Sequence, residues 1–450
     1  MFFSCANQLP PSGGEDDKSP PEIISVSPEH GKLNFRGNAV IFKFNEYVDR
    51  RSFEESFYIS PKPKGEMKFN WSGKEVEVVF QGNFEKNRTY VITIGKELKD
   101  VRGSNNTGSA YSIAFSTGSK LDKGRISGRI YSDMFDKVKI LAYILKEGSA
   151  GNPDPSRIPA DFIAQPDESG SFAFTNLPEG KFVLYAITDE DRNNLFDKDF
   201  ESVSLLNNSV LLKSDTSVIQ HADFLFRSPL PDRSGKEFLK ELYADNSGNI
   251  SSNISGNGIV IPADYRFYFY FRNNSYSKSE IVNNFSLSDS SKGIVYKPVF
   301  NWINDSLLEV FSTDKFSYSS ELSLKIDLSG RKNNVYFSVK LKTADKNSSG
   351  TVSGKITGGI TPEFPVFVFL INKDNKFISY SRKLTDTADF RFTDVFEGNY
   401  ILFTFSDKND NGTYDTGNIE PFADPEIFRF YEKEIKVKGN WTTDNLFITY

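Results

Sequence analysis

The residues most able to do chemistry in this sequence form an acidic loop near the C-terminus. Counted from Asp407, positions 1, 3, 5 and 9 carry side-chain oxygens, position 6 is a glycine, and position 7 offers a backbone carbonyl. The residues concerned are Asp407, Asn409, Asn411, Thr413 (through its carbonyl) and Asp415. Oxygen ligands at this spacing in a tight loop wrap a hard cation such as Ca²⁺. The spacing therefore predicts a structural calcium site.

This loop departs from the EF-hand calcium pattern at its last ligand. That pattern places a bidentate glutamate at position 12, where this chain has Asn418. Glu420 follows two residues later, and we expect its carboxylate to close the site. The alternative is an Asx-rich, solvated turn that only ends a strand.

A second acidic loop, at residues 189–201, repeats the pattern less completely. It has Asn194 in place of the glycine, and Phe200 at position 12 with Glu201 beside it. Asparagine tolerates a left-handed backbone better than most residues, so the turn survives this replacement. The second set of predicted ligands is Asp189, Asp191, Asn193 and Asp197. At either loop we expect a bound ion to stiffen the chain rather than to catalyse.

The rest of the sequence argues against two broad classes of function. No G-x-S-x-G, H-E-x-x-H, P-loop or glycine-rich dinucleotide motif is present, and we expect no enzymatic activity. The 54 basic and 60 acidic residues are interspersed and give a net charge of −6, which predicts no nucleic-acid partner. Aromatic residues that stack on sugars remain a route to glycan binding. The candidates are Trp71, Trp302 and Trp441, although a shared Phe-Asn-Trp context favours core positions for the first two.

Each acidic loop follows a sequence segment that occurs twice in the chain, which indicates an internal duplication. Phe174–Leu184 (FTNLPEGKFVL) is echoed by Phe392–Leu402 (FTDVFEGNYIL), and Phe-Asn-Trp recurs nearer the start of each half. The sequence therefore predicts four units in the order A-B-A′-B′. After a leading segment at 1–20, their predicted ranges are 21–118, 123–228, 245–346 and 348–450.

Apolar and polar residues alternate within each unit, which is the pattern of a strand with one buried face. In the run 74–80, valines alternate with glutamates and lead to Phe80. Helices are predicted only as short turns, one of them capped by Ser52 and another at 236–243. We therefore predict an all-β protein of four tandem β-sandwich domains.

Short motifs connect the units to known domains. Unit A contains a P-x-x-G opening at Pro28, the run Phe44-Asn45-Glu46 and a closing Phe115-Ser116-Thr117, and it resembles the bacterial Ig-like domain of surface-layer and envelope proteins. Unit B contains Phe172-Ala173-Phe174 followed by a glycine turn, and it resembles the transthyretin-like sandwich called the carboxypeptidase regulatory-like domain. A′ and B′ read as divergent copies of these two domains.

The N-terminus carries the only cysteine, Cys5, after an apolar start. This resembles the end of a bacterial lipoprotein signal peptide, whose cysteine becomes lipidated. Residues 6–21 are rich in proline, glycine and charge, and predict an extended tether. The whole arrangement is similar to Bacteroidetes-type envelope lipoproteins of Gram-negative bacteria.

That resemblance implies an acyl-anchored protein of the outer membrane, facing the periplasm or the cell surface. We expect a non-catalytic spacer or binding stalk with an envelope protein or a glycan as partner. The alternative is a glycan-binding component of a surface polysaccharide system.

Overall fold

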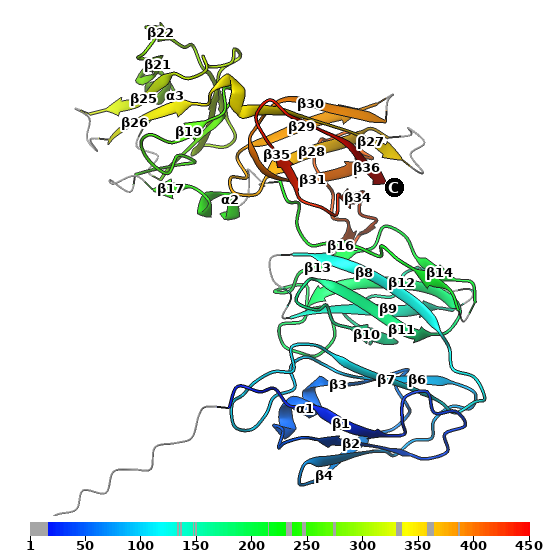
Figure 1. Cartoon of the computed structure of the whole chain (residues 1–450). Coiled ribbons are helices and arrows are strands. Elements are labelled where there is room, and N and C mark those ends of the chain that lie inside the picture. The colour runs from blue at the N-terminus through cyan, green and yellow to red at the C-terminus, as the bar shows by residue number, and fades with distance from the viewer. Residues whose placement is uncertain are drawn as a thin grey trace, which may run out of the picture. The chain divides into compact units, whose positions relative to one another are not determined.

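The computed structural model describes residues 17–450 other than 133–134, 136, 147, 149–150, 215, 231–235, 245–248, 273–275, 330–334, 358–363 and 386–387. Cys5 and the first part of the tether therefore lie outside the described residues. The chain divides into two compact units, one of residues 1–227 with 416–425 and one of 228–415 with 426–450. Both consist mainly of β-sheets (Figure 1), which confirms the predicted all-β class. None of the described helices has the length and apolar character that crossing a membrane requires.

The first sandwich forms because apolar residues alternate along its strands. One sheet has the order β1 (Ile23–Ser27), β2 (Ala39–Phe44), β5 (Glu75–Phe80), β4 (Met67–Ser72). The other has the order β3 (Phe57–Ser60), β6 (Thr89–Ile94), β7 (Tyr111–Ser116). The core is aromatic, and Phe53 makes edge-on contacts with Phe42 and Phe44 at ring-centroid distances of 5.6 and 5.7 Å.

Helix α1 (Arg50–Ser56) connects β2 to β3 and begins one turn earlier than the sequence predicts. Its N-cap is Asp49, whose carboxylate accepts a hydrogen bond from the Ser52 N–H at 2.7 Å. The prediction that Ser52 caps this helix was wrong because the Ser52 hydroxyl is engaged elsewhere. It donates to the Asp49 carbonyl and accepts from the Lys99 N–H.

The second sandwich completes the first unit. Its larger sheet has the order β10 (Phe162–Ala164), β9 (Val138–Leu145), β12 (Gly180–Thr188), β13 (Val203–Leu205), with β14 (Val210–Leu212) also paired to β12. Its other sheet joins β11 (Ser171–Leu177), β8 (Gly124–Tyr131), β15 (Val218–Ile219) and β16 (Phe224–Leu225). Strands β9 and β12 pair antiparallel up to Thr188 opposite Val138. This register places Asp189 directly after the end of β12 and Lys139 near the start of β9.

The second unit repeats this order of sandwiches. The first sheet of its first sandwich has the order β17 (Tyr243–Ala244), β18 (Ile250–Ser252), β20 (Phe267–Phe271), β24 (Leu307–Phe311), β23 (Val299–Trp302). The second sheet has the order β19 (Val260–Ile261), β26 (Val335–Thr343), β25 (Glu321–Leu328), β21 (Phe285–Asp289), β22 (Ile294–Val295). The smaller sheet of its second sandwich has the order β30 (Asp389–Phe396), β27 (Ser349–Thr357), β36 (Thr442–Thr449). The larger sheet has the order β29 (Ser379–Leu384), β28 (Val366–Asn372), β31 (Gly398–Ser406), β34 (Ile427–Phe430), and β35 (Ile435–Val437) also pairs with β31. The remaining elements are α2 (Lys236–Lys240), α3 (Lys278–Asn283), the 3₁₀ turn η1 (Lys346–Ser348) and the hairpin β32 (Asn418–Ile419), β33 (Phe422–Ala423).

The second and fourth sandwiches share one topology. In each, the edge of the small sheet is closed by a strand that runs parallel to its neighbour, β15 beside β8 and β36 beside β27. In each, a late strand also returns to the start of the central strand, β14 to β12 and β35 to β31. The repeated sequence segment therefore corresponds to a repeated arrangement of strands.

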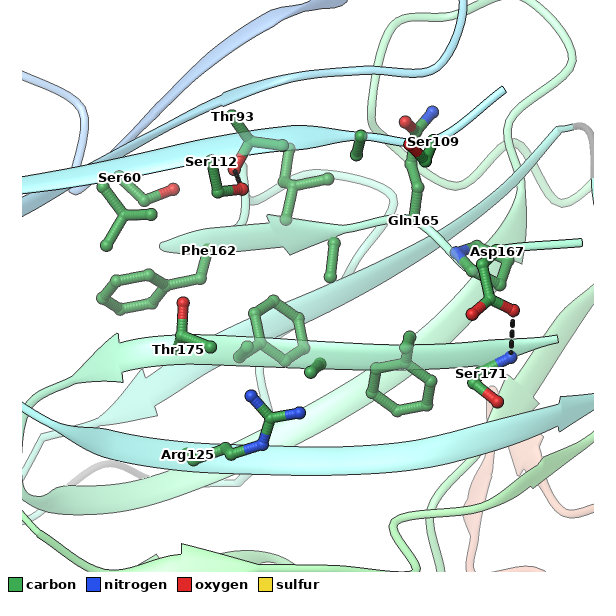
Figure 2. A pocket seen from close by; sticks show the side chains of 18 residues that line it. Ser60, Thr93, Ser109, Ser112, Arg125, Phe162, Gln165, Asp167, Ser171 and Thr175 are labelled. Carbon is green, nitrogen blue, oxygen red and sulfur yellow. Dashed lines mark hydrogen bonds between the residues drawn. The ribbon is translucent and has the colours of Figure 1, made fainter. Parts of the chain in front are cut away.

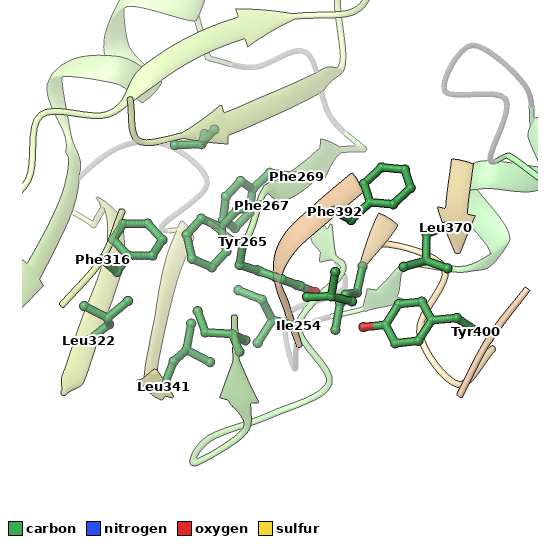
Figure 3. Close-up of a cluster of buried hydrophobic side chains, with 14 of the residues drawn as sticks. Ile254, Tyr265, Phe267, Phe269, Phe316, Leu322, Leu341, Leu370, Phe392 and Tyr400 are labelled. Carbon is green, nitrogen blue, oxygen red and sulfur yellow. The ribbon is translucent and has the colours of Figure 1, made fainter. Parts of the chain in front are cut away.

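One hydrophobic core runs through both sandwiches of the second unit (Figure 3). Phe267, Phe269 and Leu341 belong to its first sandwich, whereas Leu370 and Tyr400 belong to its second. Helix α2 adds Phe238, which contacts Tyr268 and Phe377 at ring-centroid distances of 5.2 and 5.5 Å. The two sandwiches of this unit are therefore joined by apolar packing.

Candidate metal centre

The acidic loop after β12 begins with a carboxylate that is buried but incompletely hydrogen-bonded. Asp189 is only 1% exposed. Its Oδ1 accepts from the Asn194 N–H at 3.2 Å, whereas its Oδ2 has no hydrogen-bond partner among the described residues. A buried carboxylate oxygen without a partner costs free energy unless a cation satisfies it.

The backbone of this loop curls through two left-handed residues, Arg192 (φ 64°) and Asn194 (φ 60°). The left-handed backbone at Asn194 agrees with the sequence argument that asparagine can replace glycine here. The Asp191 carboxylate accepts from the backbone and side-chain amides of Asn193, and the Asn193 Oδ1 accepts from the Leu195 N–H. These short Asx turns fix the path of the chain around the loop.

Glu201 closes the loop. It is 8% exposed, and its two carboxylate oxygens accept from the N–H groups of Glu190 at 2.7 Å and Asp197 at 2.8 Å. Asp189, Asp191 and Glu201 each present a carboxylate oxygen, and these three oxygens lie within 4.8 Å of one another. Of the four ligands predicted at this loop, two therefore join the cluster.

The other two predicted ligands, Asn193 and Asp197, serve the turns instead. The Asp197 side chain accepts from the Asp199 N–H at 3.0 Å. The third carboxylate of the cluster belongs to Glu201, which is not among the predicted ligands although it lies beside position 12. The sequence signal for this ligand is that the glutamate expected at position 12 occurs one residue later, while Phe200 at position 12 is 56% exposed.

The electrostatics of the cluster favour a cation. Burial raises the pKa of Asp189 to about 6, and the negative charges of Glu201 and Asp191 also raise it. Burial likewise raises the pKa of Glu201, with Asp191 and Asp197 adding to the effect. Close carboxylates that repel one another provide the all-oxygen environment that Ca²⁺ prefers.

The loop after β31 is closed by its own amides. Asp407 is fully buried, and both its oxygens are hydrogen-bonded, Oδ1 to the Asn411 N–H at 3.2 Å and Oδ2 to the Gly412 N–H at 2.8 Å. The side-chain amides of Asn409 and Asn411 donate to the Asp415 Oδ2 at 2.7 and 3.2 Å. The Asp415 Oδ2, which a cation would need as a ligand, is thus already hydrogen-bonded to asparagine amides.

The glutamate predicted to close this second loop and the glutamate that contacts the loop differ in burial. The Glu420 side chain is 80% exposed, whereas Glu426 is 3% exposed and accepts from the N–H groups of Lys408 at 2.6 Å and Asp415 at 3.1 Å. Glu426 therefore takes the place that Glu201 has in the first loop. The hairpin β32–β33 stands between Asp415 and Glu426 in the chain, and Glu420 lies in its turn. Thr413 donates through its N–H and hydroxyl to the Asn411 Oδ1.

One other acidic group occurs in the described part of the chain, formed by Asp17, Glu46 and Asp100. Asp100 is 2% exposed, but its oxygens accept from the Gly103 N–H at 2.6 Å and the Asn105 amide at 2.7 Å. This group therefore lacks the unpartnered buried oxygen that distinguishes the loop after β12.

The three tryptophans divide as the sequence context predicts. Trp71 and Trp302 are half-buried and pack against the cores of the first and third sandwiches. Trp441 is 67% exposed, with the Lys438 Nζ 5.5 Å from its ring centroid. It is the tryptophan whose ring is available to a ligand.

A polar cleft of about 300 Å³ lies between the two sandwiches of the first unit (Figure 2). Hydroxyl side chains of β3, β6 and β7 line one side, and residues of β10 and β11 line the other. The labelled groups include Ser60, Thr93, Ser112, Phe162 and Gln165. The boundary in this unit is therefore open and polar in part, rather than sealed throughout by apolar side chains.

Comparisons with known proteins support one domain of this architecture. The family model of the bacterial Ig-like domain matches residues 17–117, which contain the first sandwich. No curated protein matches the sequence. The matched segment confirms the Ig-like resemblance of unit A.

Solved structures resemble the chain only weakly. The Bacillus anthracis TIE protein has a TM-score of 0.16 and 10% identity, covering 98% of this chain and 76% of its own. BcpA, the major pilin subunit of Bacillus cereus, has a TM-score of 0.16 and 10% identity, covering 73% of this chain and 99% of its own. L,D-transpeptidase 3 from Mycobacterium tuberculosis has a TM-score of 0.17 and 10% identity over 22% of this chain, and the chain spans only 39% of the length of that enzyme. Similarities this low carry no information about function.

Proposed function

We propose that this protein is a non-catalytic, lipid-anchored envelope stalk, built from two stiff pairs of β-sandwiches and holding one structural calcium ion. The observation that carries the stalk role is that both pairs are joined by packed contacts. In the second unit a single core runs through both sandwiches, and in the first unit Lys139 is 2% exposed and donates to Tyr58 of the neighbouring sandwich. Packed interfaces transmit orientation from one domain to the next, as a spacer requires.

Attachment to the outer membrane through an acyl group on Cys5 is the second part of this proposal. It is supported by the lipobox-like start, by the proline-rich tether and by the envelope setting in which Ig-like domains of this kind are found. Growth of the native bacterium with an alkyne-tagged fatty acid tests it. We expect label on the natural full-length protein and none on a Cys5→Ser variant. An unlabelled wild-type protein would remove the anchor from the proposal and leave the stalk.

Calcium binding in the loop after β12 is the third part, and the unpartnered Oδ2 of Asp189 carries it. We propose Asp189, Asp191 and Glu201 as the protein ligands, with water completing the coordination. Isothermal titration of the chelator-treated full chain should show calcium-dependent heat. Asp191→Asn, an isosteric change at an exposed residue, should abolish that heat. Absence of heat in the parent protein rules the site out.

Glycan binding is a second candidate function, favoured by the exposed ring of Trp441. The ring lies just before β36, next to a lysine that can also contact a sugar hydroxyl. Retention on immobilised bacterial polysaccharides, lost in Trp441→Ala, would support it. Uniform failure to bind such polysaccharides would reject it.

A further inference from the structure

The junction between the two sandwiches of the first unit contains a buried charge. Lys139 belongs to β9 of the second sandwich, and its side chain is 3% exposed. Its Nζ donates to the Tyr58 hydroxyl at 2.8 Å and to the Glu97 Oε1 at 3.2 Å, and both acceptors belong to the Ig-like sandwich. An ammonium group of one domain is therefore held among polar groups of the other.

This network is incompletely satisfied on its acidic side. The Glu97 Oε1 also accepts from the Gln165 amide at 2.5 Å, but the Glu97 Oε2 is buried without a hydrogen-bond partner. Burial lowers the pKa of Lys139, and the negative charges of Glu97 and Asp189 act against this effect. The buried ammonium group of Lys139 is therefore paired with Glu97 at the junction.

The acidic loop also contacts the Ig-like sandwich directly. Arg192 donates to the Glu55 Oε2 at 3.1 Å, and Glu55 lies on helix α1 of that sandwich. Arg192 sits between Asp191 and Asn193 in the left-handed part of the loop, so the path of the loop sets the direction of its side chain. The corresponding residue of the loop after β31 is Asp410, which cannot make such a contact.

We infer that calcium at Asp189, Asp191 and Glu201 tightens the junction between the Ig-like sandwich and the sandwich that binds the ion. This inference rests on the proposed calcium site. The ion draws the carboxylates of Asp189, Asp191 and Glu201 together. It also fixes the backbone at Asp191, so that Arg192 loses less conformational entropy when it pairs with Glu55.

The second unit provides an internal control for this coupling. Its two sandwiches are joined by aromatic contacts among Phe238, Tyr268 and Phe377 and by a shared core. Apolar packing of this kind does not depend on a bound cation. A calcium effect on the first junction should therefore leave the second unchanged.

Hydrogen–deuterium exchange of the full chain, with calcium or with chelator, tests the coupling. We expect calcium to slow exchange in peptides that cover 189–201 and also in those that cover β3 and residues 95–98. Peptides that cover α2 and residue 377 should exchange at the same rate in both conditions. For the junction peptides we expect about a tenfold slowing, which corresponds to about 1.4 kcal/mol of added local stability.

The outcomes separate the coupling from the site. Slower exchange in 189–201 with no change in β3 and 95–98 would overturn the coupling and leave the calcium site intact. No change in 189–201 would overturn both. Arg192→Ala should keep the calcium-dependent slowing in the loop and weaken it in the junction. The matched control is Arg157→Ala, which removes an exposed arginine of the same sandwich that pairs locally with Asp154.

Discussion

The two pairs of sandwiches follow the same order along the chain but are joined by different chemistry. In the first unit the joining groups are a buried lysine, a glutamate and a tyrosine, namely Lys139, Glu97 and Tyr58. In the second unit a continuous apolar core runs from one sandwich into the next (Figure 3). An apolar junction is stable whatever ions are present, whereas a polar junction depends on how well its charges are matched. The same order of sandwiches is therefore held by a polar junction in one unit and by an apolar junction in the other.

The two acidic loops also differ in how completely their buried aspartates are hydrogen-bonded. In the loop after β31, Gly412 donates its N–H to the second oxygen of the buried aspartate. In the loop after β12, Asn194 serves only one oxygen of Asp189. The loop that matches the calcium pattern better is thus the one that needs an ion less.

The largest expected effect is at the polar junction. Lys139→Ala should lower the free energy of unfolding of the first unit by about 3–5 kcal/mol, because it leaves Glu97 largely buried without its counter-ion. Urea unfolding of the full chain measures this as a shift of one transition. The double change Lys139→Met with Glu97→Gln should recover most of the loss. If Lys139→Ala were as stable as the wild-type protein, this result would contradict a stabilising role for the buried pair of Lys139 and Glu97.

The apolar junction should respond strongly to a cavity and not at all to calcium. Phe238→Ala should destabilise the second unit by about 3 kcal/mol, because Phe238 is 1% exposed between two aromatic rings. The same urea titration, repeated with chelator, should give an unchanged value. If the destabilisation by Phe238→Ala changed with calcium, the two junctions would not differ in their dependence on the ion.

Calcium should stabilise the first unit selectively. At a concentration about 100 times its dissociation constant, the ion should add about 2.7 kcal/mol to the free energy of unfolding. Differential scanning calorimetry with and without chelator measures this as a shift of the first unit's transition. Asp191→Asn should abolish the shift and Asp415→Asn should retain it. The reverse pattern would assign the ion to the loop after β31.

The smallest effect concerns the surface contact of the acidic loop. Without calcium, Arg192→Ala should cost no more than about 1 kcal/mol, because Arg192 is 52% exposed and surface ion pairs contribute little. The comparison with Arg157→Ala by chemical unfolding isolates the contact with Glu55. A loss of several kcal/mol would mean that this ion pair, rather than Lys139, holds the junction.

Much of the architecture was predictable because it depends on local patterns. The alternation in 74–80 predicts a strand with one buried face, and Val76, Val78 and Phe80 of β5 are buried. The repeated segment after Phe174 predicts the shared topology of the second and fourth sandwiches. Spacing also brought Asp189 and Asp191 into one candidate site.

The parts that could not be predicted depend on contacts distant in sequence or on inserted residues. Glu426 replaces Glu420 because a hairpin separates it from the rest of its loop. The role of Lys139 depends on Glu97, which lies on another domain. No periodicity in the sequence indicates which oxygen of Asp189 is left without a donor, because that depends on the precise path of the loop.

We propose that the loop after β12 binds an ion and that the loop after β31 does not. Native mass spectrometry of the full chain in calcium tests it most directly, because it counts bound ions. We expect one calcium ion per chain, lost in Asp191→Asn and kept in Asp415→Asn. Two ions, no ion, or a single ion that survives Asp191→Asn and disappears in Asp415→Asn would contradict it.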